Sequence, residues 1–325
     1  MGGGRGPNDG DAEGSALNAL PICQRTVARE TEFTGTALHT GDRVSLRLLP
    51  APPDHGLLFV RNDVSDSVAV PGRIDHVVGV TRGTTIRANG ATVQTVEHVM
   101  AALAAFGVSN ARIELTAGEP PVGDGSSAPF VALLEEAGVV EQPATVTPLA
   151  VVEPLYIESG ATLMIALPHP GGLRISCTIA YETPSLTGQF LSLLITRESF
   201  VRELARARTF CLYDEIEPLM RAGLIQGGSL ENAVVIRDSI ILSKEGLRYP
   251  DEFVRHKVLD IVGDLALLGR PLHAHVIALK PGHGANVELA RALAARLAGA
   301  PAAAGPAETV EAGGHEDHVR RAVAG

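Results

Sequence analysis

Residues 251–269 read DEFVRHKVLDIVGDLALLG, an apolar stretch crossed by a stripe of polar side chains. His256, Asp260 and Asp264 follow at intervals of four residues, so a helix would place them on one face. Apolar residues occupy most of the remaining positions, which predicts a buried helix over about 252–268. If the helix is buried, the polar side chains of the stripe need hydrogen-bonding or charged partners inside the protein. If the helix lies on the surface, water solvates the same side chains. This segment alone leaves both interpretations open.

The rest of the chain predicts an α+β fold with two similar sets of elements. The first set comprises strands at 26–34, 43–49, 57–61 and 111–117, a helix that Gly107 ends, and a helix from Phe130 that Gly138 ends. The second comprises strands at 150–158, 161–167, 173–181 and 272–279 and helices at 196–206, 252–268 and 285–298. We therefore expect domains at 21–145 and 146–299, disordered ends at 1–20 and 300–325, and an interruption of the second domain at about 210–235.

Composition excludes several classes of function. A net charge of −10 opposes nonspecific nucleic-acid binding, which needs a positive field. The three cysteines form no C-x-x-C and no paired framework, and the N-terminal residues lack the basic start and apolar core of a signal peptide. We find no window of about 20 apolar residues for a membrane span. We therefore expect a cytoplasmic protein that acts as a monomer.

A second motif supplies partners for the polar stripe. In TVEHVMAAL, residues 95–103, Glu97 and His98 are adjacent at a predicted helix start, so their side chains diverge by about 100°. His98, His256 and Asp260 together form a three-ligand zinc site that leaves one position for water. Glu97 would then lie near that water as its general base. An acidic residue at a helix start is also a common charge preference, and only the combination of motifs favours catalysis.

The loop KPGHGAN, residues 280–286, offers an acid for the opposite side of such a site. His283 lies there between glycines after an apolar strand. A protonated histidine in that place could donate a proton to a leaving group. The alternative is a solvated loop histidine.

Seven blocks of sequence, in collinear order over about residues 25–298, resemble one enzyme family. They are ALHTGDRVSLRLLPA, TVEHVMAALAAFGVSN, DGSSAPF, RARTF, GGSLENAVV, DEFVRHKVLDIVGDL and KPGHGAN. These blocks are similar to the UDP-3-O-acyl-N-acetylglucosamine deacetylases of lipid A biosynthesis. The resemblance implies two β-α-α-β sandwich domains, related by internal duplication, with the active site between them and a small inserted subdomain in the second.

The resemblance also implies a role for each motif residue. His98, His256 and Asp260 would be the zinc ligands, with Fe²⁺ as a possible substitute, and Glu97 the base. His283 would be the protonated histidine, and Asp264 would orient it. Thr209 in RARTF would assist the oxyanion, and Lys257 would meet the nucleotide's phosphates.

The interruption at 210–235 resembles the family's apolar passage for the acyl chain of the substrate. The candidate wall residues are Phe210, Tyr213, Ile216, Met220, Ile225, Leu230 and Val235. The alternative for these residues is ordinary domain core. A helix followed by a Gly-Gly turn would close a compact core poorly, which favours passage walls.

Four residues depart from the family pattern. Arg82 and Gly83 stand where an apolar and a small residue are expected, in a loop that is shorter than in well-known members. Cys211 replaces a frequent glycine, and Thr162 a frequent lysine. We nevertheless expect hydrolysis of the N-acetyl group of an acylated UDP-N-acetylglucosamine. The alternatives are the same zinc chemistry on another acylated sugar nucleotide, or a non-catalytic lipid-binding paralog.

Overall fold

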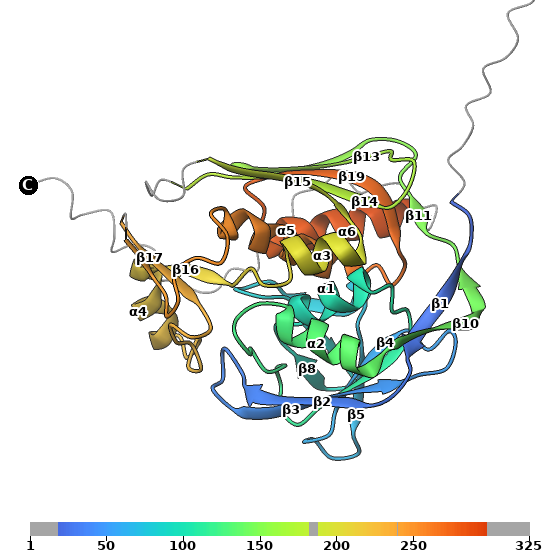
Figure 1. Cartoon of the computed structure of the whole chain (residues 1–325), viewed down its shortest axis with the longest axis horizontal. Helices are drawn as coiled ribbons and strands as arrows, with labels where there is room; N and C mark the ends of the chain where they lie inside the picture. The colour runs from blue at the N-terminus through green and yellow to red at the C-terminus, as the bar shows by residue number, and fades with distance from the viewer. Residues whose placement is uncertain (1–18, 182–187, 239, 298–325) are drawn as a thin grey trace, which may run out of the picture.

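The structure is a computed structural model that describes residues 19–181, 188–238 and 240–297. The predicted disordered ends therefore lie, apart from residues 19 and 20, outside the described residues. The chain folds as a mixed α+β protein in which two large sheets form the outer layers and helices lie between them (Figure 1).

The first sheet is built from the N-terminal half of the chain. Its strands lie in the order β2 (Thr31–Thr36), β3 (Arg43–Pro50), β9 (Ala111–Leu115), β4 (Leu57–Arg61) and β5 (Val68–Pro71). The second sheet has the order β12 (Leu155–Ser159), β13 (Thr162–Leu167), β19 (Leu272–Leu279), β14 (Leu173–Ile179) and β15 (Gln189–Ile195), and β11 (Leu149–Ala150) also pairs with β19.

The two sheets share one pattern of strand order and direction. In each, the strand that comes last in the sequence lies at the centre. β9 is antiparallel to β3 and parallel to β4, and β19 is antiparallel to β13 and parallel to β14. β9 and β19 thus occupy the centres of their sheets, although each follows the other strands of its sheet in the sequence. The segments next to these two strands therefore lie near the middle of each half.

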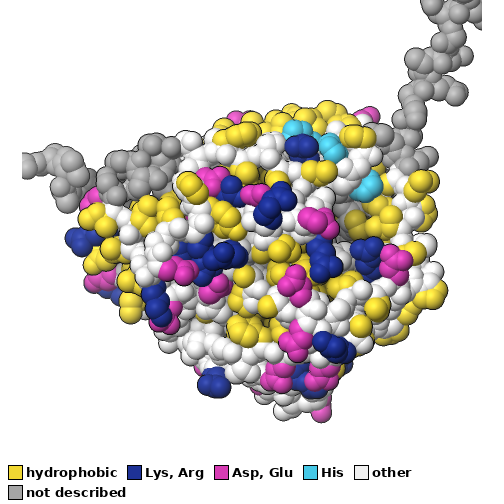
Figure 2. Space-filling view, in the orientation of Figure 1, with side chains coloured by type: hydrophobic (Ala, Val, Ile, Leu, Met, Phe, Trp, Pro, Cys, Tyr) yellow, Lys and Arg dark blue, Asp and Glu magenta, His cyan; other side chains and the backbone are white. Residues whose placement is uncertain are grey.

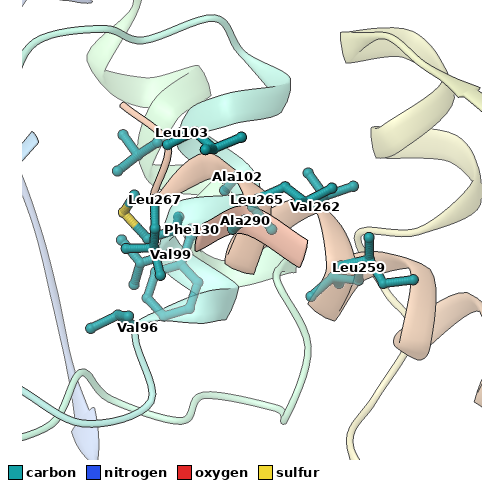
Figure 3. Packing of buried hydrophobic residues seen from close by; sticks show 14 of the residues in the cluster. Val96, Val99, Ala102, Leu103, Phe130, Leu259, Val262, Leu265, Leu267 and Ala290 are labelled. Carbon is teal, nitrogen blue, oxygen red and sulfur yellow. The ribbon is translucent and has the colours of Figure 1, made fainter. Parts of the chain in front are cut away.

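The helices fill the space between the sheets. They are α1 (Glu97–Ala105), α2 (Ala128–Ala137), α3 (Arg197–Glu203), α5 (Glu252–Ala266) and α6 (His283–Leu297). Apolar side chains of α1, α2, α5 and α6 meet in one cluster, in which Val99, Phe130, Val262 and Ala290 are examples (Figure 3). Because α1 and α5 are buried on almost every side, their polar residues face a protein interior instead of solvent.

Smaller elements complete the fold. β1 (Ile22–Val27) pairs with β10 (Val139–Val146), and β6 (Val77–Gly79), β7 (Thr85–Ala88) and β8 (Ala91–Val93) form a small sheet after the 3-10 turn Ile74–His76. The interruption of the second half forms β16 (Phe210–Leu212), α4 (Tyr213–Arg221), β17 (Val234–Arg237) and β18 (Ile240–Leu242), which project to one side (Figure 1).

Two predicted strands are in fact broken. The predicted strand 26–34 is divided between β1 and β2, because the chain leaves one sheet at Val27 and enters another at Thr31. The predicted strand 150–158 is divided between β11 and β12, and Pro154, which has no N–H to donate, lies in the gap. Helix α3 is also shorter than predicted, since Thr196 caps its start and it ends at Glu203.

Charged side chains of both signs lie on the surface, and the helices are short. On the face that Figure 2 shows, Lys and Arg lie among Asp and Glu and are not gathered in one stripe. Within the described residues, no helix is long and apolar enough to cross a membrane.

Candidate metal centre and active site

His256 and Asp260 lie one turn apart on α5, and His98 approaches them from the start of α1. Nε2 of His256 lies 3.3 Å, and Nε2 of His98 3.7 Å, from Oδ1 of Asp260. Ligand atoms of the three buried residues all lie within 4.8 Å of one another. The two helices touch directly: a Cβ added at Gly263 would lie 2.0 Å from the carbonyl oxygen of Glu97. This contact explains how segments about 160 residues apart in sequence reach one point.

The donor atoms of this cluster fit a divalent cation. Nδ1 of His256 lies 3.0 Å from the carbonyl oxygen of Ala207 and donates to it in the neutral tautomer, which leaves the Nε2 lone pair facing the cluster. Oδ2 of Asp260 accepts a bond from Nζ of Lys257 at 3.0 Å, whereas its buried Oδ1 has no hydrogen-bond partner among the described residues. A buried carboxylate oxygen without a donor is unfavourable, and a cation would satisfy it.

The protonation states also suit a metal ligand set. Burial lowers the pKa of His256 to about 4, so its imidazole is neutral at pH 7. Burial would raise the pKa of Asp260, but His256 and Lys257 outweigh it and hold that pKa well below its ordinary value. A neutral imidazole and an ionised carboxylate are the forms that bind metal.

Glu97 lies beside the cluster in a site made by the loop before β7. Its Oε2 accepts the backbone N–H of Thr84 at 2.9 Å. A Cβ at Gly83 would lie 3.1 Å from its Oε1, a tight contact that glycine avoids beside the carboxylate. Burial raises the pKa of Glu97, an effect that His283 and His98 oppose. A carboxylate with a raised pKa beside an open metal position is suited to accept a proton from water.

His283 begins α6 on the other side of Glu97. Its Nδ1 lies 2.9 Å from Oδ2 of Asp264, and its Nε2 lies 3.9 Å from Oε1 of Glu97. Burial would lower the pKa of His283, but the surrounding carboxylates, Asp264 first, raise that pKa to about 9. The imidazole is therefore charged at pH 7 and can donate a proton.

A second carboxylate and histidine cluster, Glu97, Asp264 and His283, also has its donor atoms close together. The carboxylate of Asp264 is already satisfied by Thr84 Oγ1 at 2.5 Å, Asn286 Nδ2 at 2.8 Å and His283. Both oxygens of Asp264 thus have hydrogen-bond partners, whereas the buried Oδ1 of Asp260 has none among the described residues, so the first cluster is the better candidate metal site.

The other predicted catalytic and phosphate residues lie at the edge of this centre. The Lys257 ammonium, held by Asp260, also lies 5.6 Å above the ring of Phe210. The backbone of Thr209 is fixed from two sides, because its N–H donates to Gly125 and its carbonyl accepts from Val234. The structure thus places both residues between the metal cluster and the inserted elements.

A pocket of about 270 Å³ opens beside Thr209, within the inserted elements. Six of the seven predicted wall residues line it, namely Phe210, Ile216, Met220, Ile225, Leu230 and Val235. Tyr213 does not; it is exposed, and its ring lies under the guanidinium of Arg237 at 4.6 Å. Helical spacing alone would place Tyr213 on the same face as Ile216 and Met220, at i, i+3 and i+7. Tyr213 is the first residue of α4, and its ring instead packs against Arg237 of β17.

The sequence analysis missed several residues that support the site. Thr84 and Asn286 hold Asp264, and no sequence motif indicated Thr84. His39 begins the sequence HTG, residues 39–41, in the block ALHTGDRVSLRLLPA, and it contacts the inserted elements. Its carbonyl accepts the N–H of Gln226 at 3.2 Å, and its buried ring lies at the pocket wall with Nδ1 3.4 Å from the N–H of Ile225. The HTG sequence was the available signal for His39, but its partner Ile225 lies 186 residues away in the sequence.

Two imidazoles and a carboxylate around one buried point, with a second carboxylate and a charged histidine beside them, are the arrangement typical of metal-dependent hydrolases. The comparisons with known proteins identify the particular family. The sequence model of LpxC, UDP-3-O-acyl N-acetylglycosamine deacetylase, matches residues 24–295. The chain therefore belongs to this family.

Relatives with the name UDP-3-O-acyl-N-acetylglucosamine deacetylase match most of the chain. A protein of Myxococcus xanthus is 46% identical over 82% of this chain and 85% of its own length. One of Anaeromyxobacter sp. is 47% identical over 82% and 87%. One of Chlamydia felis is 42% identical over 86% and 99%.

Proposed function

We propose that this chain hydrolyses the N-acetyl amide of a UDP-linked 3-O-acylated N-acetylglucosamine, giving the free amine and acetate. The observation that carries the proposal is the convergence of His98, His256 and Asp260 on one point that Glu97 and His283 flank. The names of the relatives support this substrate over a different acylated sugar nucleotide. A non-catalytic lipid-binding paralog would have no need of the base and the charged histidine.

His98, His256 and Asp260 would hold the ion, which we propose to be zinc, although Fe²⁺ suits the same donor set. When bound, the ion supplies Lewis acidity to the amide carbonyl and acidifies water. Glu97 accepts the proton of the attacking water, because its raised pKa makes it a competent base.

His283 holds the proton that the leaving amine requires. Asp264 keeps the ring oriented and charged, and Thr209 would donate to the oxyanion that develops on the carbonyl. Lys257 lies at the rim, where the phosphates of the nucleotide would meet its ammonium. The pocket beside Thr209 would take the acyl chain, since aliphatic and aromatic side chains predominate in its wall.

The identical strand order of the two sheets supports two duplicated sandwich domains, which we place at 21–145 and 146–299. We propose that the protein acts as a monomer. We place the enzyme in the cytoplasm, with no nucleic acid as partner.

Acetate release from the acylated UDP-sugar, measured together with zinc content, tests this function. We expect wild-type protein with one zinc to release acetate, and Glu97→Gln to keep the zinc but lose at least about 100-fold in turnover. A zinc-loaded wild-type enzyme that leaves this substrate intact would refute the proposal.

A further inference from the structure

Arg82 and Glu215 form an ion pair between two segments 133 residues apart in sequence. Nη2 of Arg82 lies 2.7 Å from Oε1 of Glu215, and Nη1 lies 3.0 Å from Oε2, so both guanidinium nitrogens engage the carboxylate. This two-point geometry is the strongest form of an arginine–carboxylate contact. Glu215 is fixed in turn by the N–H of Leu212, which donates to its Oε2 at 3.2 Å in the first turn of α4.

Helix α4 has few other attachments. None of its described side chains is fully buried, and Tyr213 and Met220 are among the exposed large hydrophobic residues. No other hydrogen bond or ion pair found among the described residues joins α4 to the N-terminal half. The loop after α4 is held differently, because Gln226 and Gly227 donate backbone bonds to His39 and Leu38. The position of α4 therefore depends on the Arg82–Glu215 pair more strongly than the position of a well-packed helix depends on any one contact.

The pair also lies at the pocket that we assign to the acyl chain. Arg82 lines that pocket together with Ile216, Leu219 and Met220 from one side of α4. On its other side, Arg82 precedes Gly83 and Thr84, which contact Glu97. The ion pair thus connects a wall of the pocket to the loop that supports the base.

We propose that the Arg82–Glu215 pair holds α4 against the N-terminal half and thereby determines how well the pocket accepts long acyl chains. This inference rests on the proposed function and adds a specificity-determining contact to it. Arg82 acts as a positioning residue, through α4. An acyl chain that reaches Ile216 and Met220 gains from a fixed wall, because each buried methylene contributes to binding only where it finds packed partners. A short chain that ends before α4 gains nothing.

The test measures kcat and KM for substrates that differ only in acyl-chain length, with wild type and Arg82→Gln. We expect the substitution to raise KM about fivefold for long chains, the upper range for a half-exposed ion pair. KM for the shortest chains and kcat should stay within about twofold. An equal effect on every chain length, or an effect on kcat alone, would overturn the proposal, since it would mean that Arg82 acts through the loop beside Glu97.

A double-mutant cycle shows whether the pair is the cause. Glu215→Gln keeps an oxygen for the N–H of Leu212 but removes the charge. If the two residues act through their contact, Arg82→Gln, Glu215→Gln and the double variant all raise KM by about the same factor. Effects that multiply in the double variant overturn the proposal. Arg82→Lys, which keeps the charge without the two-point geometry, should fall between wild type and Arg82→Gln.

Arg221→Gln is the matched control, because Arg221 pairs with Glu217 within α4 and has no hydrogen bond or ion pair to the described part of the N-terminal half. It should leave KM unchanged at every chain length, and a fivefold change would overturn the proposal.

Hydrogen exchange of the α4 amides gives a readout that needs no substrate. We expect faster exchange in α4 of Arg82→Gln, with α1 unchanged, even if the enzyme proved to act on another compound. Unchanged exchange in α4 would overturn the inference and leave the proposed function standing.

Discussion

The imidazole of His283 lies 2.9 Å from the carboxylate of Asp264, and Asp264 cannot turn away from it. Thr84 and Asn286 bind the same carboxylate from two other elements, β7's preceding loop and α6. Asp264 is completely buried on α5, one turn after Asp260. One helix therefore carries two of the three proposed metal ligands and the residue that we propose orients His283, which fixes the distance between them.

Asp264→Asn should lower kcat about 10- to 100-fold, the usual range for a residue that orients a metal-site group. The amide keeps the size of the side chain but removes the charge that stabilises protonated His283. Zinc content should stay at the wild-type level. Full turnover in this variant would contradict the role that we give to Asp264.

His256→Ala should lose both stoichiometric zinc and at least about 100-fold in turnover, because two remaining ligands hold a divalent ion poorly. The measurement is metal analysis after dialysis against a chelator, followed by readdition of zinc. Wild type should recover its activity and His256→Ala should not. Stoichiometric zinc in His256→Ala would show that the metal binds at another site.

Gly263→Ala should destabilise the protein by about 3 kcal/mol, the upper range for overpacking. The new Cβ would meet the backbone of Glu97 at 2.0 Å, and neither backbone can move without opening the helix pair. Denaturant unfolding measures the effect. Gly282→Ala is the control, since a Cβ there has no heavy atom within 4 Å and should change the free energy of unfolding little.

Glu252→Gln should lower the free energy of unfolding at pH 7 by about 3–5 kcal/mol, because it leaves the buried guanidinium of Arg208 with only the more distant, half-exposed Glu245 at 3.7 Å as a charged partner. Burial would raise the pKa of Glu252, but its bonds from Arg208 and Arg248 hold that pKa below the ordinary 4.5. Its contribution to stability is thus complete above pH 4.5 and is lost as the pH falls through the lower folded-state pKa.

The free energy of unfolding should therefore fall less between pH 7 and pH 3 in Glu252→Gln than in wild type. Unfolding curves at both pH values measure the difference. Parallel losses in the two proteins would show that Glu252 does not carry this acid dependence.

Much of the element pattern could be predicted from periodicity and glycine stops. Helices α1 and α5 and strands such as β13 and β19 appear near their predicted positions. The breaks at residues 28–30 and at Pro154 could not be predicted with the same certainty, because an extended segment looks alike in one strand or in two. Whether the segment forms one strand or two depends on which sheet offers it a neighbouring strand for hydrogen bonding.

The local motifs by themselves predicted candidate residues for metal-ligand and acid–base chemistry, and they determined that His256 and Asp260 share a helical face whatever surrounds them. Only the tertiary structure decided that Glu97 and His98 meet that face across the contact at Gly263, that Thr84 holds Asp264, and that Tyr213 leaves the pocket. The pairing of Arg82 with Glu215 was equally invisible in the sequence. The physical reason is that side-chain periodicity is a local property of the backbone, whereas contacts between distant segments depend on how whole elements pack.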